Sequence, residues 1–251
     1  MNAAMKSLKY LVPNGFTATS MLFGLASVVM SASGEFVLAA WMILWGVLLD
    51  KLDGTAARLL NATSGFGVQF DSFADFVIFG IAPASLFYFR LAEMPGYEAG
   101  AGRLLLLISV GVFVVATSAR LARFNISEPP GGDRIFYGIP TTLIGALLAS
   151  AYLTWDLYGL RESFLEPAPF YLLVAGVAMV SNVRLPKLKG RENKVIHYFQ
   201  IVNIAAVYIM TPFKLMPEYL LFLCCLYITI GVTWAFFNPP EEVSEQREAA
   251  A

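Results

Sequence analysis

Four aspartates lie in two neighbouring apolar segments, in pairs whose spacing fits one face of a helix. Asp50 and Asp53 are three residues apart, and Asp71 and Asp75 are four apart. Residues three or four apart share a helix face, so a short turn between two helices brings both pairs to one place. A carboxylate near the centre of a bilayer costs roughly 2.5–3.5 kcal/mol. The cost of four carboxylates therefore predicts that bound cations compensate their charge.

The donor set indicates which cations would bind. Carboxylate oxygens without Cys or His favour hard ions such as Mg²⁺, Mn²⁺ or Ca²⁺. Two divalent ions neutralise four nearby charges better than one ion does, so we expect a dinuclear site. Gly54 and Ala57 share a face with Asp50, and Gly67 lies four residues before Asp71. These small residues leave a trough in which a ligand can approach the backbone.

An ordinary surface role is the alternative, because paired carboxylates often stand at the cytosolic end of a helix. The helical phase of both pairs and the small residues interleaved with them favour the metal site.

The elements that must position these side chains are membrane helices. The chain is 58% hydrophobic and 14% charged, with a mean hydropathy of +0.66, against roughly 45–50% and 25% in soluble domains. We therefore expect an all-α integral membrane protein, a bundle of about eight transmembrane helices. The apolar stretches long enough to cross a bilayer are Leu11–Ser33, Phe36–Leu49, Phe66–Phe89, Leu104–Leu121, Tyr137–Trp155, Phe170–Val183, Phe199–Pro212 and Tyr219–Phe237.

The second stretch is short as an apolar run, and we expect its helix to continue to Leu59. Asp50 and Asp53 then fall at the cytosolic end of the span, just inside the membrane. A cytosolic N-terminus places thirteen of the seventeen Lys and Arg residues on the cytosolic side, as the positive-inside rule requires. Both termini and the aspartates are therefore expected on the cytosolic side. As a separate expectation, we take the membrane to be the inner membrane of a prokaryotic cell.

One domain, residues 1–237, holds all these helices, and the tail 238–251 is expected to be disordered because of its Pro and Glu content. A net charge of −1 argues against nucleic acid as a partner, since no basic excess exists to neutralise phosphates. Membrane lipids are the expected surroundings.

The complete pattern D-x-x-D-G-x-x-A-R, eight residues, G-x-x-x-D-x-x-x-D runs from Asp50 to Asp75 and resembles the signature of the CDP-alcohol phosphotransferases, membrane enzymes of phospholipid synthesis. The resemblance implies two divalent cations, Mg²⁺ or Mn²⁺, held by Asp50, Asp53 and Asp71, with Asp75 as a further ligand or the general base. It also implies a homodimer. The residues it implies for binding cytidine diphosphate are Asn14, Thr17, Asp50, Gly54, Ala57, Arg58, Gly67 and Asp71.

Three further segments, Ala119–Asn125, Phe136–Pro140 and Ser181–Lys187, resemble elements of the phosphatidylserine synthase branch of that family. This implies transfer of the phosphatidyl group from CDP-diacylglycerol to the hydroxyl of L-serine, giving phosphatidylserine and CMP. A serine carboxylate needs cations and its ammonium group needs an acceptor. The residues expected to bind serine are Arg120, Arg123, Asn125 and Lys187.

Several alternatives stay open at this point. Arg120 and Arg123 are also placed to anchor the helix at the lipid headgroups. Inositol phosphate, glycerol phosphate or choline would serve as acceptor in the same chemistry. A divalent-cation transporter is a different class, because carboxylates inside a membrane also mark ion paths, although these aspartates gather at one side of the bilayer only.

Overall fold

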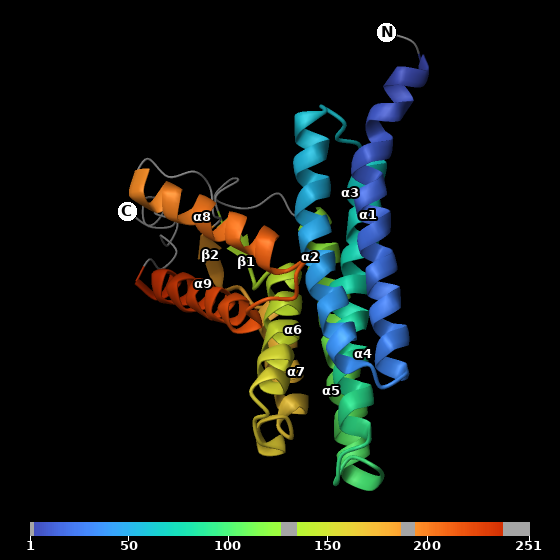
Figure 1. Ribbon diagram of the computed structural model, residues 1–251, viewed down its shortest axis with the longest axis vertical. Coiled ribbons are helices and arrows are strands. Elements are labelled where there is room, and N and C mark those ends of the chain that lie inside the picture. The colour runs from blue at the N-terminus through green and yellow to red at the C-terminus, as the bar shows by residue number, and fades with distance from the viewer. Residues whose placement is uncertain (1–2, 127–134, 187–193, 238–251) are drawn as a thin grey trace, which may run out of the picture.

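A computed structural model describes residues 3–126, 135–186 and 194–237 of the chain (Figure 1). The tail 238–251 and Lys187 lie outside this part. The described elements are α1 (Ala3–Ala32), α2 (Phe36–Leu59), α3 (Gly65–Asp75), α4 (Ala82–Ala92), α5 (Gly100–Ile126), β1 (Ile135–Tyr137), α6 (Thr141–Leu157), α7 (Ala168–Val180), β2 (Arg184–Pro186), α8 (Lys194–Met210) and α9 (Pro217–Phe237).

A helix occupies each of the eight predicted positions, and α2 does continue to Leu59. Within the described residues, five helical segments are long and apolar enough to cross a membrane, namely Lys9–Ala32, Gly65–Ala92, Gly100–Ile126, Glu162–Val180 and Pro217–Phe237. The other helices fall short for different reasons. The C-terminal half of α2 is charged, whereas α6 and α8 each have only 17 residues. The prediction of an all-helical membrane protein is thus confirmed at this level.

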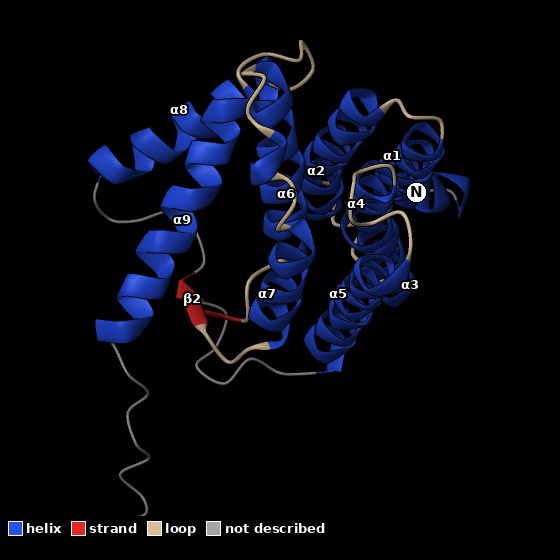
Figure 2. Cartoon of the chain, turned by 90° about the horizontal axis from the view of Figure 1, so that it is seen from below, coloured by secondary structure: helices blue, strands red, loops and turns tan. Residues whose placement is uncertain are grey.

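The helices do not all run in one direction. In Figure 1, α8 and α9 cross the direction of the remaining helices, and Figure 2 shows both of them along their length while α1 is seen nearly end-on. The α2–α3 turn, the C-terminal end of α5 and the C-terminal end of α7 lie toward the same end of the bundle. That end holds the predicted site residues.

The start of α6 differs from the prediction. A helix was expected from Tyr137, but Ile135–Tyr137 pairs with Arg184–Pro186 as a short antiparallel ladder, and the helix begins at Thr141. Pro140 explains the difference, because the residue before a proline avoids the helical region. Gly138 takes a φ of +74°, and its N–H donates to the Val183 carbonyl at 2.8 Å.

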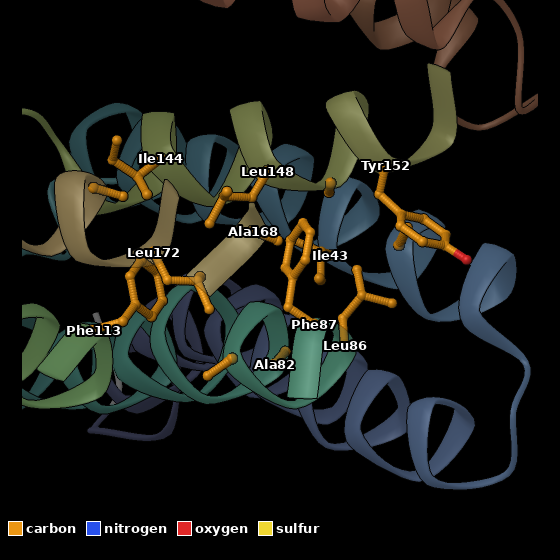
Figure 3. Close-up of a cluster of buried hydrophobic side chains, with 14 of the residues drawn as sticks. Ile43, Ala82, Leu86, Phe87, Phe113, Ile144, Leu148, Tyr152, Ala168 and Leu172 are labelled. Atoms are coloured by element: carbon orange, nitrogen blue, oxygen red, sulfur yellow. The ribbon is translucent and has the colours of Figure 1, made fainter. Parts of the chain in front are cut away.

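The core lies between α2, α4, α5, α6 and α7, where apolar side chains interdigitate (Figure 3). A π-helical turn, Phe76–Ile81, joins α3 to α4 without a break. Ile78 and Phe79 on this turn are fully buried. A Cβ added at Gly46 would overlap the Ile78 side chain, and one added at Gly145 would come within 2.7 Å of Phe79 Cδ1. Glycines on α2 and α6 therefore provide the space that this wide turn needs.

Candidate active site

The α2–α3 turn sets how the two aspartate pairs face each other. Asn61, two residues after the end of α2, lies in the left-handed region with φ 48°. Its carbonyl accepts a hydrogen bond of 2.7 Å from Lys9 Nζ on α1. Ser64 caps α3, because its Oγ accepts the Gly67 N–H at 3.0 Å. Such a cap satisfies one of the free N–H groups at a helix start. The turn is thus fixed at both ends, and α3 runs back from it packed against α1.

Three of the four aspartates meet in space. Asp50, Asp53 and Asp71 each offer one carboxylate oxygen, and these oxygens lie within 4.8 Å of one another. Asp53 is only 5% exposed, and Asp50 and Asp71 are partly buried. The convergence expected from the spacing is therefore present for these three residues, while their role as metal ligands stays a prediction.

Asp75 stands one helical turn beyond Asp71 and interacts electrostatically with both Asp50 and Asp71. It is outside the group of three oxygens described above. The π-helical turn starts at the next residue, Phe76. Turns of this type inside α-helices often occur at functional sites, and here the turn follows directly on the fourth aspartate.

Positive charge near these carboxylates is sparse. Lys51 Nζ lies 3.3 Å from Asp50 Oδ2, but the lysine side chain is 63% exposed. Among the described residues, no donor reaches Asp50 Oδ2 with hydrogen-bond geometry, although this oxygen is buried. A buried oxygen of this kind needs a partner. The cluster therefore suits a multivalent cation, and its all-oxygen donors suit a hard one.

The first helix supports the cluster from one side. Thr17 Oγ1 is buried and lies 2.7 Å from Asp53 Oδ2, and it lies 3.1 Å from the Pro13 carbonyl oxygen. Asn14 faces α3, since a Cβ added at Gly67 would be 3.6 Å from Asn14 Oδ1. Both residues expected from the first helix thus lie beside the aspartate helices.

The other residues of the signature face a more open region. Gly54 and Ala57 are partly buried, and Arg58 is exposed. Arg58 Nη2 lies 3.4 Å from Thr55 Oγ1. The nearest atom to a Cβ added at Gly54 would be Arg58 Nη1, at 3.6 Å. Gly54 therefore leaves space next to the exposed guanidinium group of Arg58.

The two arginines near the end of α5 have different surroundings. Arg123 Nη1 donates to the Val180 carbonyl at 3.0 Å and its Nη2 to the Ser181 carbonyl at 3.3 Å, so it caps the C-terminal end of α7. Arg120 is 7% exposed, and its Nη1 lies 3.4 Å from Thr141 Oγ1. It interacts electrostatically with Asp75, and its buried Nε has no hydrogen-bond partner in the described part of the chain.

Asn125 connects α5 to α3, the helix of Asp71 and Asp75, because its Nδ2 donates to Ser72 Oγ at 2.9 Å. Neither Ser72 nor Thr141 belongs to the site residues expected from the sequence. Each is an ordinary hydroxyl residue whose partner comes from another helix, and no spacing along one helix reveals that partner. The fourth residue expected to bind the acceptor, Lys187, is outside the described residues.

Comparison with known proteins identifies the relatives of this chain. Residues 10–185 match the model of the CDP-alcohol phosphatidyltransferase family. A CDP-diacylglycerol–serine O-phosphatidyltransferase of Helicobacter pylori is 36% identical over 90% of this chain and 92% of the relative. The enzyme of the same name from Methanocaldococcus jannaschii is 31% identical over 76% of this chain and 81% of the relative. An archaetidylserine synthase of Methanothermobacter thermautotrophicus is 30% identical over 66% of both chains.

Proposed function

The chain belongs to the CDP-alcohol phosphatidyltransferase family, and on that premise we propose that it transfers the phosphatidyl group of CDP-diacylglycerol to the hydroxyl of L-serine, giving phosphatidylserine and CMP. The observation that carries the proposal is the crowding of Asp50, Asp53 and Asp71 next to Asp75 and the buried Arg120. The names of the relatives support serine as the acceptor.

The metal requirement follows from the donors. Asp50, Asp53 and Asp71 would hold two divalent cations, Mg²⁺ or Mn²⁺, with Asp75 able to share one of them. When bound, these ions stabilise negative charge on both the entering and the leaving oxygen of the reacting phosphorus. The sparse positive charge of the protein around the cluster supports this assignment.

The side chains of the protein bind and orient the two substrates. Asn14, Thr17, Gly54, Ala57, Arg58 and Gly67 line the approach to the cluster and would contact the cytidine diphosphate. Asp75 would take the proton of the serine hydroxyl as the serine oxygen forms its bond to the phosphorus that carries diacylglycerol. The bond between that phosphorus and the oxygen of CMP breaks, so CMP leaves with the bonding electron pair.

Arg120 is the cation that we assign to the serine carboxylate. A guanidinium forms paired hydrogen bonds to a carboxylate, and Arg120 is buried beside the proposed base with an unused donor. Arg123 donates hydrogen bonds to two carbonyls at the C-terminal end of α7, so we assign it a structural role next to the site. Asn125 is held by Ser72 near the same helix end, within the proposed acceptor region.

A direct assay tests this proposal. Purified protein in detergent micelles is given CDP-diacylglycerol and Mn²⁺ with serine, inositol phosphate, glycerol phosphate or choline in turn, and CMP release is measured. CMP release that depends on serine, together with phosphatidylserine detected by mass spectrometry, is the expected result. Release with another acceptor alone would change the assigned substrate. Passage of Mn²⁺ into liposomes without any CMP release would favour a cation transporter.

We also propose an orientation with both termini and the aspartate cluster on the cytosolic side of a prokaryotic inner membrane, and a homodimeric assembly. The distribution of Lys and Arg supports the orientation. Labelling of single cysteines placed at residues 9 and 61 with a membrane-impermeant reagent tests it, because cytosolic positions react only after the cells are opened. Crosslinking in membranes followed by mass analysis tests the dimer.

A further inference from the structure

The C-terminal part of α8 is attached to α2 close to the aspartates, although α8 follows the residues matched by the family model. Tyr208 donates its hydroxyl hydrogen to the Leu48 carbonyl at 3.4 Å. Trp45 Nε1 donates to the Thr211 carbonyl at 3.0 Å. Leu48 precedes Asp50 by two residues on α2, and the phenol attached to its carbonyl lies within electrostatic range of Asp50 and Asp53.

The phenol of Tyr208 interacts electrostatically with Asp50 and Asp53, and its side chain is partly buried. Its bond to Leu48 is long for an O–H donor, whose common distance is about 2.7–2.8 Å. In the same region, Asp50 Oδ2 is buried, and Lys51 Nζ lies 3.3 Å from it but outside hydrogen-bond geometry. The carboxyl group of Asp50 also shares a side-chain hydrogen bond with Asp75. A carboxylate accepts several hydrogen bonds, so Asp50 can take a further one from the weakly engaged phenol.

We propose that Tyr208 is a positioning residue for Asp50, whose phenol hydroxyl bonds to the Asp50 carboxylate and holds it in the orientation that binds a divalent cation. Groups that hydrogen-bond to metal ligands fix the ligand orientation and often matter nearly as much as the ligands. This inference rests on the proposed function, because it assumes that Asp50 is a ligand. It adds to the site a residue from a helix beyond the signature.

The first test replaces Tyr208 by phenylalanine, which removes the hydroxyl and keeps the ring. Mn²⁺ affinity is measured by electron paramagnetic resonance on the full-length protein without substrates. We expect roughly tenfold weaker Mn²⁺ binding in Tyr208→Phe, within the range for lost partners of metal ligands. Saturating Mn²⁺ should restore most of the rate of CMP release. The matched control is Tyr227→Phe on α9, whose hydroxyl donates to the Pro186 carbonyl at 2.9 Å, and its Mn²⁺ affinity should stay unchanged.

A second variant separates positioning from simple attachment of the helix. Trp45→Phe removes the hydrogen bond to Thr211 and leaves the Tyr208 phenol in place. Unchanged Mn²⁺ affinity in Trp45→Phe, with weakened affinity in Tyr208→Phe, supports the proposal. Equal weakening in both variants overturns it, and so does wild-type affinity in Tyr208→Phe.

The proposed function fails in a different way. A wild-type protein that binds Mn²⁺ but releases no CMP with any acceptor contradicts the proposed transferase activity. The Mn²⁺ affinities of the Tyr208 variant and its controls still test the positioning role. A wild-type protein that binds no Mn²⁺ overturns both proposals.

Discussion

The two ends of the helix bundle both carry carboxylates, but they differ in the cationic side chains that face them. At the end formed by the α1–α2 turn and the C-terminal ends of α4 and α6, Arg90 Nη2 lies 3.2 Å from Glu162 Oε1, and its guanidinium lies 5.3 Å from the Trp155 ring centre. At the other end, three carboxylates lie within 4.8 Å of one another beside one exposed lysine. At the first end the protein's own arginine faces an acid, whereas on the proposed function the second end takes positive charge from bound cations.

Acidic residues also differ between the ends in their access to water. Glu35, Glu93 and Asp156 line a hollow of about 360 Å³ next to Arg90, and all three are exposed. Water solvates such carboxylates, so they need no cation. Asp53 is buried, and one oxygen of Asp50 is buried without a hydrogen-bond donor in the described part of the chain. The comparison shows that burial without compensation, rather than the number of acids, distinguishes a candidate metal site.

The sharpest way to break this comparison is to neutralise one acid at each end. Asp71→Asn should reduce serine-dependent CMP release by about a thousandfold or more, because metal ions supply several kcal/mol of transition-state stabilisation and each 1.4 kcal/mol is a factor of ten. Glu93→Gln is the matched change in the exposed hollow and should keep nearly the wild-type rate. Initial rates of CMP release measure both. Equal losses in the two variants would remove the distinction between the ends.

The second prediction compares two arginines three residues apart on α5. Arg120→Gln should raise the KM for serine roughly 10- to 100-fold, since a hydrogen bond to a charged group is worth about 1.5–3 kcal/mol. The KM for CDP-diacylglycerol should change little. Arg123→Gln should instead lower the thermal unfolding temperature, because it removes the cap on α7, with a smaller effect on serine. Steady-state kinetics in each substrate separates the cases, and the reverse pattern would exchange the assigned roles.

Much of the fold follows from apolar runs and charge spacing. The eight helices lie where apolar stretches predict them, because helices in lipid must satisfy their backbone polar groups internally. The phase of Asp50, Asp53 and Asp71 also predicts their convergence, which needs only helix geometry and one short turn. These inferences succeed because each depends on residues close together in the sequence.

The remaining features depend on contacts between distant segments. Arg120 and Arg123 have the same chemistry and share a helix, and only the position of the α7 terminus tells them apart. The π-helical turn after Asp75 needs space made by Gly46 and Gly145 on other helices. The Tyr208 attachment joins residues 160 positions apart. No local pattern encodes such pairings.

The third prediction concerns the packing that connects the two ends. Gly46→Ala should destabilise the protein by about 1–3 kcal/mol, the usual cost of overpacking a core, because the new methyl group overlaps the Ile78 side chain. Ile78→Val in the same chain should recover part of the loss by providing space. Gly111→Ala on α5 is the control, since a Cβ there meets no atom within 4 Å. Denaturant titration in micelles measures all three, and a neutral Gly46→Ala would contradict the packing account.

The smallest effect is expected at the compensated end. Glu162→Gln removes the charge that faces Arg90, but the Glu162 side chain is 58% exposed, and such pairs contribute about 0–1 kcal/mol. Arg90 keeps its contacts with the rings of Trp155 and Phe36, so unfolding should shift little and CMP release should stay at the wild-type rate. Denaturant titration and the CMP assay together check this. A loss of activity without a loss of stability would show that the two ends are coupled through the bundle, and the contrast between a ligand-dependent end and a self-sufficient end would no longer hold.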